Sequence, residues 1–199
     1  MKKIVIIGPE STGKSTLCEQ LARHYQTLWV PEFAREYLQT NGKDYTFENL
    51  LTIAKGQMAL EEKYIDLLES SSRLGREKTG NQSAPFPIHP PSAKADSILF
   101  IDTDMYVVKV WCEFVFDKCH NWILNQIALR KYDLYLLCNI DLPWVKDSLR
   151  EYPDLATRAK LYYYYKDIVL NQATPWIDIS GNYKQRLNRA IQGIDSNIS

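Results

Sequence analysis

One segment near the amino terminus combines residue types that bind phosphate. Residues 8–15 read GPESTGKS and fit the pattern G-x-x-x-x-G-K-[ST]. The glycines let backbone amides point inward at phosphate oxygens, Lys14 adds a positive charge, and Ser15 offers a hydroxyl to Mg²⁺. A chance glycine turn before a helix is the alternative, but it does not account for the full pattern. The candidates for binding ATP are Gly8, Pro9, Glu10, Ser11, Thr12, Gly13, Lys14, Ser15 and Thr16.

A carboxylate that ends a later apolar run is the second candidate metal ligand. Asp102 follows the run 98–101, and ligands of parallel sheets bind at the carboxyl edge of the strands. We therefore predict that Asp102 binds Mg²⁺ together with Ser15 and takes part in catalysis. Asp104 is a candidate for substrate binding. Both aspartates are also suited to capping the next helix, and the sequence does not separate these roles.

The segment after the second predicted strand carries an acidic and a basic residue, Glu32 and Arg35, at the carboxyl edge of the predicted sheet. Glu32 is placed to accept or orient the proton of an attacking hydroxyl, because phosphoryl transfer depends mainly on positioning and on neutralising charge. Arg35 is a candidate for substrate binding. The alternative is an exposed helix start in which Arg35 pairs with a neighbouring acid.

Two arginines flank the polar turn 151–154, between two predicted helical stretches. We interpret residues 146–160 as a small lid. Arg150 and Arg158 on such a lid would neutralise charge on the transferring phosphoryl group and exclude water, which gives them a catalytic role. The alternative is a surface hairpin that carries ordinary arginines.

Aromatic and turn residues near two strand ends are candidates for binding flat rings. Trp144 follows the run 132–138, and its indole would stack on a substrate ring. Ser180 and Gly181 follow the run 176–179, where their backbone would approach adenine, although a plain turn also explains the glycine. Core packing is the alternative for Trp144 and the main interpretation of Tyr106, Trp111 and Trp122.

These candidates depend on an alternation of strands and helices. Apolar runs separated by segments with helical spacing favour a parallel sheet covered on both faces, because parallel strands need crossover connections that are usually helices. The predicted class is α/β. The predicted strands are 3–7, 28–30, 98–101, 132–138 and 176–179. The predicted helices are 14–25, 33–38, 47–68, 105–116 and 183–191, with a further helix around 162–165.

Length and composition favour one globular domain over residues 1–199. Residues 70–97 are rich in Ser, Gly, Lys and Pro, which predicts a flexible insertion. The 24 basic and 24 acidic side chains leave no net charge to attract a polyanion, so we expect no nucleic-acid partner. The apolar opening stops at Gly8, well short of the ~20 residues of a membrane span, so we expect no membrane partner and a cytoplasmic location. The four cysteines are scattered and indicate neither disulfides nor a zinc site.

Four segments together resemble a known family. GPESTGKST, VPEFAREYL, FIDTD and NIDLPWVKDSLR look like the ribosylnicotinamide kinase domain of NadR-type NAD-biosynthesis proteins, within the P-loop AAA-like ATPase and kinase group. The resemblance implies a three-layer P-loop kinase fold with a parallel five-stranded sheet and a small helical lid. It also implies phosphorylation of the ribose 5′-hydroxyl of nicotinamide riboside by ATP. The implied roles fall on the phosphate loop, Glu32, Asp102, Arg150 and Arg158, and we expect this chain to be the kinase part alone.

Two other functions remain as alternatives. The chain is either a kinase for another nucleoside or a binding switch that responds to ATP or GTP without catalysis. A GTPase is disfavoured, because Asn139-Ile140-Asp141 lacks the lysine and the spacing of a guanine-reading segment. In each case the partner is a small molecule or a protein rather than nucleic acid.

Overall fold

The computed structural model describes residues 1–74 and 98–198. These residues contain a five-stranded parallel sheet in the order β2-β3-β1-β4-β5. Because β1 is central and the chain crosses it between β3 and β4, the strand order reverses beside β1, and the carboxyl edge at that point is where such sheets bind ligands. The strands are β1 (Lys2–Ile7), β2 (Trp29–Val30), β3 (Ile98–Asp102), β4 (Leu134–Cys138) and β5 (Trp176–Ile179).

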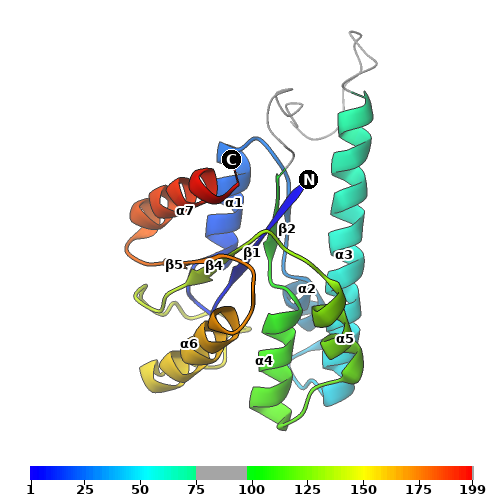
Figure 1. Ribbon diagram of the computed structural model, residues 1–199. Coiled ribbons are helices and arrows are strands. Elements are labelled where there is room, and N and C mark those ends of the chain that lie inside the picture. The colour runs from blue at the N-terminus through cyan, green and yellow to red at the C-terminus, as the bar shows by residue number, and fades with distance from the viewer. Residues whose placement is uncertain (75–97, 199) are drawn as a thin grey trace.

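Helices cover both faces of this sheet, which makes three layers (Figure 1). α1 and α7 lie on one face, and α3, α4 and α6 pack against the other. α2 and α5 pack against α3 and α4 through a further apolar cluster. The helices of the described residues are α1 (Lys14–His24), α2 (Phe33–Asn41), α3 (Phe47–Leu74), α4 (Met105–Phe116), α5 (Asn121–Leu129), α6 (Leu155–Leu170) and α7 (Tyr183–Asn197).

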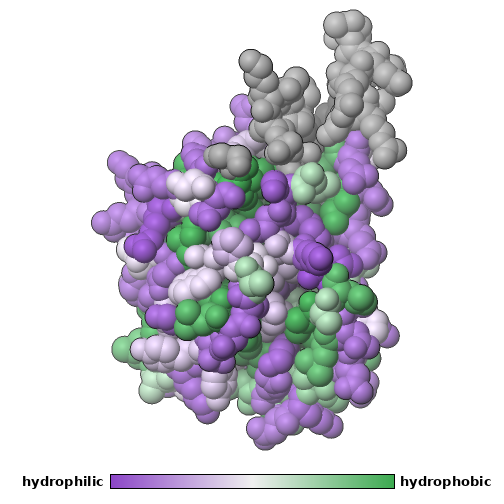
Figure 2. Space-filling view, viewed as in Figure 1, coloured by the Kyte–Doolittle hydropathy of each residue, from purple (hydrophilic) through white to green (hydrophobic). Residues whose placement is uncertain are grey.

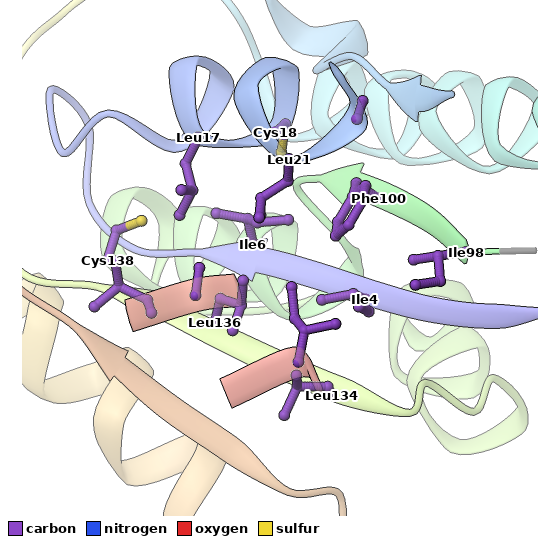
Figure 3. Close-up of a cluster of buried hydrophobic side chains, with 14 residues drawn as sticks. Ile4, Ile6, Leu17, Cys18, Leu21, Ile98, Phe100, Leu134, Leu136 and Cys138 are labelled. Atoms are coloured by element: carbon purple, nitrogen blue, oxygen red, sulfur yellow. The ribbon is translucent and has the colours of Figure 1, made fainter. Parts of the chain in front are cut away.

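The central strand is buried on both faces, as a parallel sheet between helices requires. Ile4 and Ile6 face the cluster that contains Leu17 and Leu21 of α1, and Figure 3 shows these side chains between the helix and the strands. The residues between them on β1 face the cluster on the α4 and α6 side. Alternate residues of β1 therefore pack against the helix layers on the two faces of the sheet. This packing fixes the position of the carboxyl end of β1, where the phosphate loop begins.

The structure confirms the predicted α/β fold with five parallel strands and corrects several boundaries. α4 and β5 have the predicted bounds. α3 extends to Leu74, so the predicted insertion is wrong for residues 70–74; no glycine or proline interrupts residues 57–74. Residues 75–97 of that insertion lie outside the described residues. α5 was not predicted from the sequence.

The predicted lid also differs in its first half. Residues 146–154 contain no helix, whereas residues 155–160 belong to α6. The prediction of helical stretches on both sides of the turn 151–154 is therefore wrong. Asp154 caps α6 by accepting a hydrogen bond from the backbone N–H of Thr157 at 2.7 Å, so the chain enters the helix only after the turn.

Exposed hydrophobic side chains are scattered over the surface. On the face drawn in Figure 2, hydrophilic residues predominate between small hydrophobic areas. Leu129 and Leu155 are among the most exposed large hydrophobic residues, and they lie on different helices. Within residues 1–74 and 98–198, no helix has the length and apolar character needed to cross a membrane.

Candidate active site

A cavity of about 230 Å³ opens at the carboxyl edge of the sheet. Its floor is the phosphate loop, residues 8–16, which follows β1. One wall comes from the start of α2, another from α4 and α6, and the last from residues 149–152. The lining residues outside the phosphate loop are Glu32, Ala34, Arg35, Leu38, Val107, Val110, Trp111, Phe114, Leu149, Arg150, Glu151, Tyr152, Leu161 and Tyr165.

The phosphate loop needs its two glycines for different reasons. Gly8 has φ +139°, and a Cβ there would lie 2.7 Å from the carbonyl oxygen of Cys138 on β4. Gly13 has φ +78° and precedes α1, where no side chain caps the helix and no acid occupies the first turn. The first amides of α1 therefore remain available for an anion. Lys14 Nζ donates a hydrogen bond to the carbonyl oxygen of Pro9 at 3.0 Å, which curls its side chain over the loop.

Ser15, which lines the cavity, is in contact with Asp102. Ser15 Oγ donates to Asp102 Oδ2 at 2.5 Å. Asp102 is fully buried at the end of β3, where it pairs in register with Ile6 of β1. Burial, and next the negative charge of Glu32, raise the pKa of Asp102 to about 6, although Lys14 and Ser15 act in the opposite direction. A buried carboxylate of this kind gains from a nearby cation.

Glu32 stands at the start of α2 and faces the same cavity. It is the N-cap residue of α2, but its side chain makes no capping hydrogen bond. Its carboxylate lines the cavity and is close enough to Asp102 to raise the pKa of that group. The backbone on both sides of Glu32 is held by Gln57, a residue that the sequence analysis did not single out as functional.

Arg35 lines the cavity and pairs with a distant acid. Its Nη2 lies 3.2 Å from Asp147 Oδ2, in the segment between β4 and α6. The backbone N–H of Leu149 and then the Arg35 guanidinium lower the pKa of Asp147. The alternative of an ion pair is therefore correct in kind, but the partner belongs to the segment after β4 rather than to α2.

The tip of the phosphate loop is hydrogen-bonded to residues 144–152, which overlap the first part of the predicted lid 146–160. We call residues 144–152 the lid segment. The carboxylate of Glu10 accepts from the backbone N–H groups of Glu151 at 2.9 Å and of Tyr152 at 2.7 Å, and from the indole of Trp144 at 3.2 Å. Ser11 Oγ accepts from Arg150 Nη1 at 3.2 Å. These bonds draw Arg150 to the cavity. Trp144 does not line the cavity and contacts the phosphate loop, and its place against a substrate ring stays a prediction.

Arg158 is a buried cation that forms no salt bridge with an acid among the described residues. It is 4% exposed, its Nη2 donates to the carbonyl oxygen of Leu142 at 3.3 Å, and its Nε has no hydrogen-bond partner in this part of the chain. Burial lowers the pKa of Arg158, with Glu10 opposing and Arg150 adding to the effect. The alternative of an ordinary surface arginine is therefore wrong. Arg158 lies near the loop but behind the cavity lining.

One other predicted site residue, Asp104, lies outside the cavity lining. Asp104 is buried and caps α4: it accepts from the backbone N–H groups of Tyr106 at 3.0 Å and Val107 at 3.3 Å, and from the Tyr135 hydroxyl at 2.9 Å. The cap alternative is thus correct for Asp104. Burial raises its pKa to about 7. Trp111, interpreted mainly as core, packs against the apolar cluster of α2, α3, α4 and α5 and also lines the cavity.

Ser180 and Gly181 also lie outside the cavity lining. They are linked to the phosphate loop by Arg186 of α7, which sequence reasoning missed. Arg186 is 2% exposed and donates to the carbonyl oxygens of Thr12 at 2.9 Å and Gly181 at 2.7 Å. It also donates to the carbonyl oxygen of Asn139 and forms an ion pair with the Asp141 carboxylate. Because Thr12, Asn139 and Asp141 are far from Arg186 in the sequence, no local pattern indicates this role.

The strand order, the phosphate loop and the two carboxylates define a P-loop domain with the fold of the nucleoside and nucleotide kinases. The chain belongs to the AAA domain family AAA_28, which residues 3–186 match. The trifunctional NAD biosynthesis/regulator protein NadR of Salmonella typhimurium (strain LT2) is 28% identical over 150 residues, which are 75% of this chain and 31% of that protein. The expected resemblance to NadR-type proteins is confirmed, although the chain spans only about a third of this curated relative.

Solved structures agree with this fold. The crystal structure of NadR protein in complex with NR has a TM-score of 0.70 at 19% identity and covers 98% of this chain and 50% of that one. Thymidylate kinase from Ehrlichia chaffeensis has a TM-score of 0.61 at 14% identity, over 97% of this chain and 98% of that one. At 19% and 14% identity, these two structures show that the fold is shared.

Proposed function

We propose that the protein is an ATP-dependent kinase that phosphorylates the ribose 5′-hydroxyl of nicotinamide riboside to give nicotinamide mononucleotide. The observation that carries this proposal is a single cavity with a complete phosphate loop on one side and Glu32 with an apolar, aromatic wall on the other. The relationship to NadR, one of whose structures is described with NR bound, supports this acceptor.

The triphosphate of ATP would lie in the phosphate loop. The loop amides and the first turn of α1 would bind phosphate oxygens, and Lys14 would exchange its bond to Pro9 for the terminal phosphates. The Nε of buried Arg158, which has no hydrogen-bond partner among the described residues, supports an anion nearby, because a buried guanidinium without a salt bridge is costly. We propose that Ser180 and Gly181 border the adenine, on the side of the loop that Arg186 holds.

Ser15 and Asp102 fit a magnesium ion. Within the described residues no group of three or more His, Cys, Asp and Glu side chains gathers to hold a metal, and Mg²⁺ in kinases is held by one or two protein oxygens and the substrate phosphates. The raised pKa of Asp102 supports a cation there, since burial penalises an unpaired carboxylate. When bound, Mg²⁺ would neutralise phosphate charge.

The chain's own groups would then carry out the transfer. Glu32 would accept the proton of the 5′-hydroxyl as the oxygen forms a bond to the γ-phosphorus, and the bond to the ADP oxygen breaks. Lys14 and Arg150 would neutralise the charge that develops on the phosphoryl group. The lid segment would exclude water and so suppress hydrolysis.

The acceptor side of the cavity suits a nucleoside. Trp111 and Phe114 offer aromatic faces, and the Trp111 indole donates to the Tyr45 hydroxyl at 2.9 Å, which holds its ring in place. Aromatic faces attract cationic rings such as the pyridinium of nicotinamide riboside. We place the reaction in the cytoplasm, which agrees with four free cysteines in the structure.

The experiment that tests this function is mass spectrometry of the products formed from Mg-ATP and a mixture of nucleosides that includes nicotinamide riboside. The proposal predicts nicotinamide mononucleotide as the main product, and phosphorylation of another nucleoside instead would change the acceptor. Lys14→Ala is expected to lower the rate by on the order of 10²- to 10³-fold, because no other loop residue supplies its charge. Lys43→Ala, at an exposed position, is the control.

A binding switch is the second candidate function. The bonds from Glu10 and Ser11 to the lid segment favour it, because they connect the nucleotide site directly to a surface segment. Tight binding of ATP or GTP without turnover in the presence of any acceptor would support the switch and contradict the kinase.

A further inference from the structure

Gln57 of α3 uses its whole side-chain amide to hold the backbone around Glu32. It is 2% exposed, and its Oε1 accepts from the backbone N–H of Phe33 at 2.7 Å. Its Nε2 donates to the carbonyl oxygens of Pro31 at 3.2 Å and of Asp102 at 3.4 Å. The partners fix the orientation of the amide, since a backbone N–H needs an acceptor and two carbonyls need donors.

The sheet itself cannot supply these bonds. The pairing of β2 with β3 ends at Val30 and Ile101. Beyond this pair comes Pro31, which has no N–H to donate to β3. The next backbone groups on both strands would be left without partners, and buried backbone groups are nearly always paired. The Gln57 side chain replaces the backbone hydrogen bonds that β2 and β3 do not form there. It joins the end of β3 to the segment that carries Glu32.

α3 is a firm support for this amide. Leu50, Ile53 and Met58 of the same helix are buried in an apolar cluster. At Gly56 a Cβ would lie 2.1 Å from the Phe33 ring, so the ring packs directly on the α3 backbone. Two adjacent residues of α3 therefore fix the start of α2, one by hydrogen bonds and one by close packing.

We propose that Gln57 is a positioning residue that sets the place of the Glu32 carboxylate relative to Asp102 and the phosphate loop. The proposal rests on the proposed function, in which Glu32 accepts the proton of the acceptor. Gln57 does not line the cavity, so it acts through Glu32 and not by contact with substrate. A misplacement of about 1 Å at a reacting group costs up to about 100-fold in rate.

A double-mutant cycle separates this role from a merely structural one. Gln57→Leu is expected to lower kcat by on the order of 10- to 100-fold while the KM for ATP stays within about twofold. In a Glu32→Gln background the same substitution should change kcat by less than about twofold, because the group through which it acts is gone. Gln57→Asn, which keeps the amide on a shorter stem, is the second variant if Gln57→Leu does not fold.

Hydrogen exchange at the Phe33 amide gives a readout that needs no activity. Gln57→Leu should speed exchange at this amide by more than about tenfold. Met58→Ala truncates a core residue of the same helix and is the matched control: it should lower stability without selective loss of protection at Phe33.

Each outcome decides one point. Equal losses of kcat in the two backgrounds, or unchanged protection at Phe33, would overturn the role of Gln57. If the wild-type protein transfers phosphate to no acceptor, the proposed function fails, and hydrogen exchange at Phe33 still decides whether Gln57 anchors the segment around Glu32. Loss of protection together with a non-additive cycle is the result that the proposal predicts.

Discussion

The hydroxyl of Ser15 and the carboxylate of Asp102 form a direct hydrogen bond at 2.5 Å between the first turn of α1 and the end of β3. The two residues are 87 positions apart, and the pairing of β1 with β3 and the packing of α1 on β3 bring them together. The bond joins a hydroxyl suited to Mg²⁺ to a buried acid whose pKa is raised to about 6 by that burial. This pair connects the phosphate loop to the neighbouring strand.

Asp102 and Asp104 should respond differently to the same substitution. Asp102→Asn removes the buried charge beside Ser15 and is expected to lower Mg²⁺-dependent turnover by on the order of 10²-fold or more. Asp104→Asn keeps a side chain that caps helices well and lies outside the cavity, so turnover should stay within a few-fold of wild type. Steady-state ADP release measures both. Equal losses in the two variants would contradict the separate roles.

The two raised pKa values predict how stability depends on pH in the absence of nucleotide. Burial raises the pKa of Asp102 to about 6 and of Asp104 to about 7, so the folded protein binds these protons more tightly than the unfolded chain. The contribution of each group to the free energy of unfolding should therefore rise as the pH falls from about 8 towards 4, by at most about 1.4 kcal/mol per pH unit for each.

Urea unfolding between pH 5 and 8 measures this dependence. The slope should be smaller in Asp102→Asn, because one of the two groups no longer titrates. An identical slope in wild type and variant would show that Asp102 is not protonated with folding in this range. Below about pH 4 the sign reverses for Asp147, whose lowered pKa means that protonation removes stability.

Glu10 is expected to suppress the hydrolysis of ATP that competes with phosphate transfer to the acceptor. Its carboxylate holds the lid segment by three hydrogen bonds, so Glu10→Ala should free that segment and let water enter the cavity. The ratio of ATP hydrolysis to phosphate transfer should rise by several-fold, and the amides of Glu151 and Tyr152 should exchange faster. Glu36→Ala, at an exposed site on α2, is the control. An unchanged ratio would mean that these bonds do not retain the lid segment.

The sequence was informative where the signal is local. The phosphate loop is a contiguous motif. Asp102 ends a buried strand, and a parallel sheet places the ends of its strands at one edge, so the nearness of Asp102 to the loop was predictable as well. The structure brings Lys14, Glu32, Arg35 and Arg150 to one cavity, and Asp102 is bonded to Ser15 in its lining.

Other features depend on long-range contacts that leave no local pattern. Gln57 binds backbone atoms of distant segments, and Arg186 binds the backbone of Thr12 and the carboxylate of Asp141, so the residues next to them in the sequence do not reveal these roles. The position of Trp144 after a strand end suggested that it binds a ring, but its indole N–H donates a hydrogen bond to the carboxylate of Glu10. Asp104 and Asp102 were indistinguishable until the capping bonds of α4 could be seen.

The most direct test of the account is the rate of phosphate transfer to nicotinamide riboside by wild type and Glu32→Gln at saturating Mg-ATP. The substitution removes the charge and the proton acceptor but keeps the shape, so ATP binding should stay within about twofold while transfer falls by on the order of 10²- to 10⁴-fold. Transfer at the wild-type rate in Glu32→Gln would contradict the assignment of Glu32 as the group that receives the acceptor's proton.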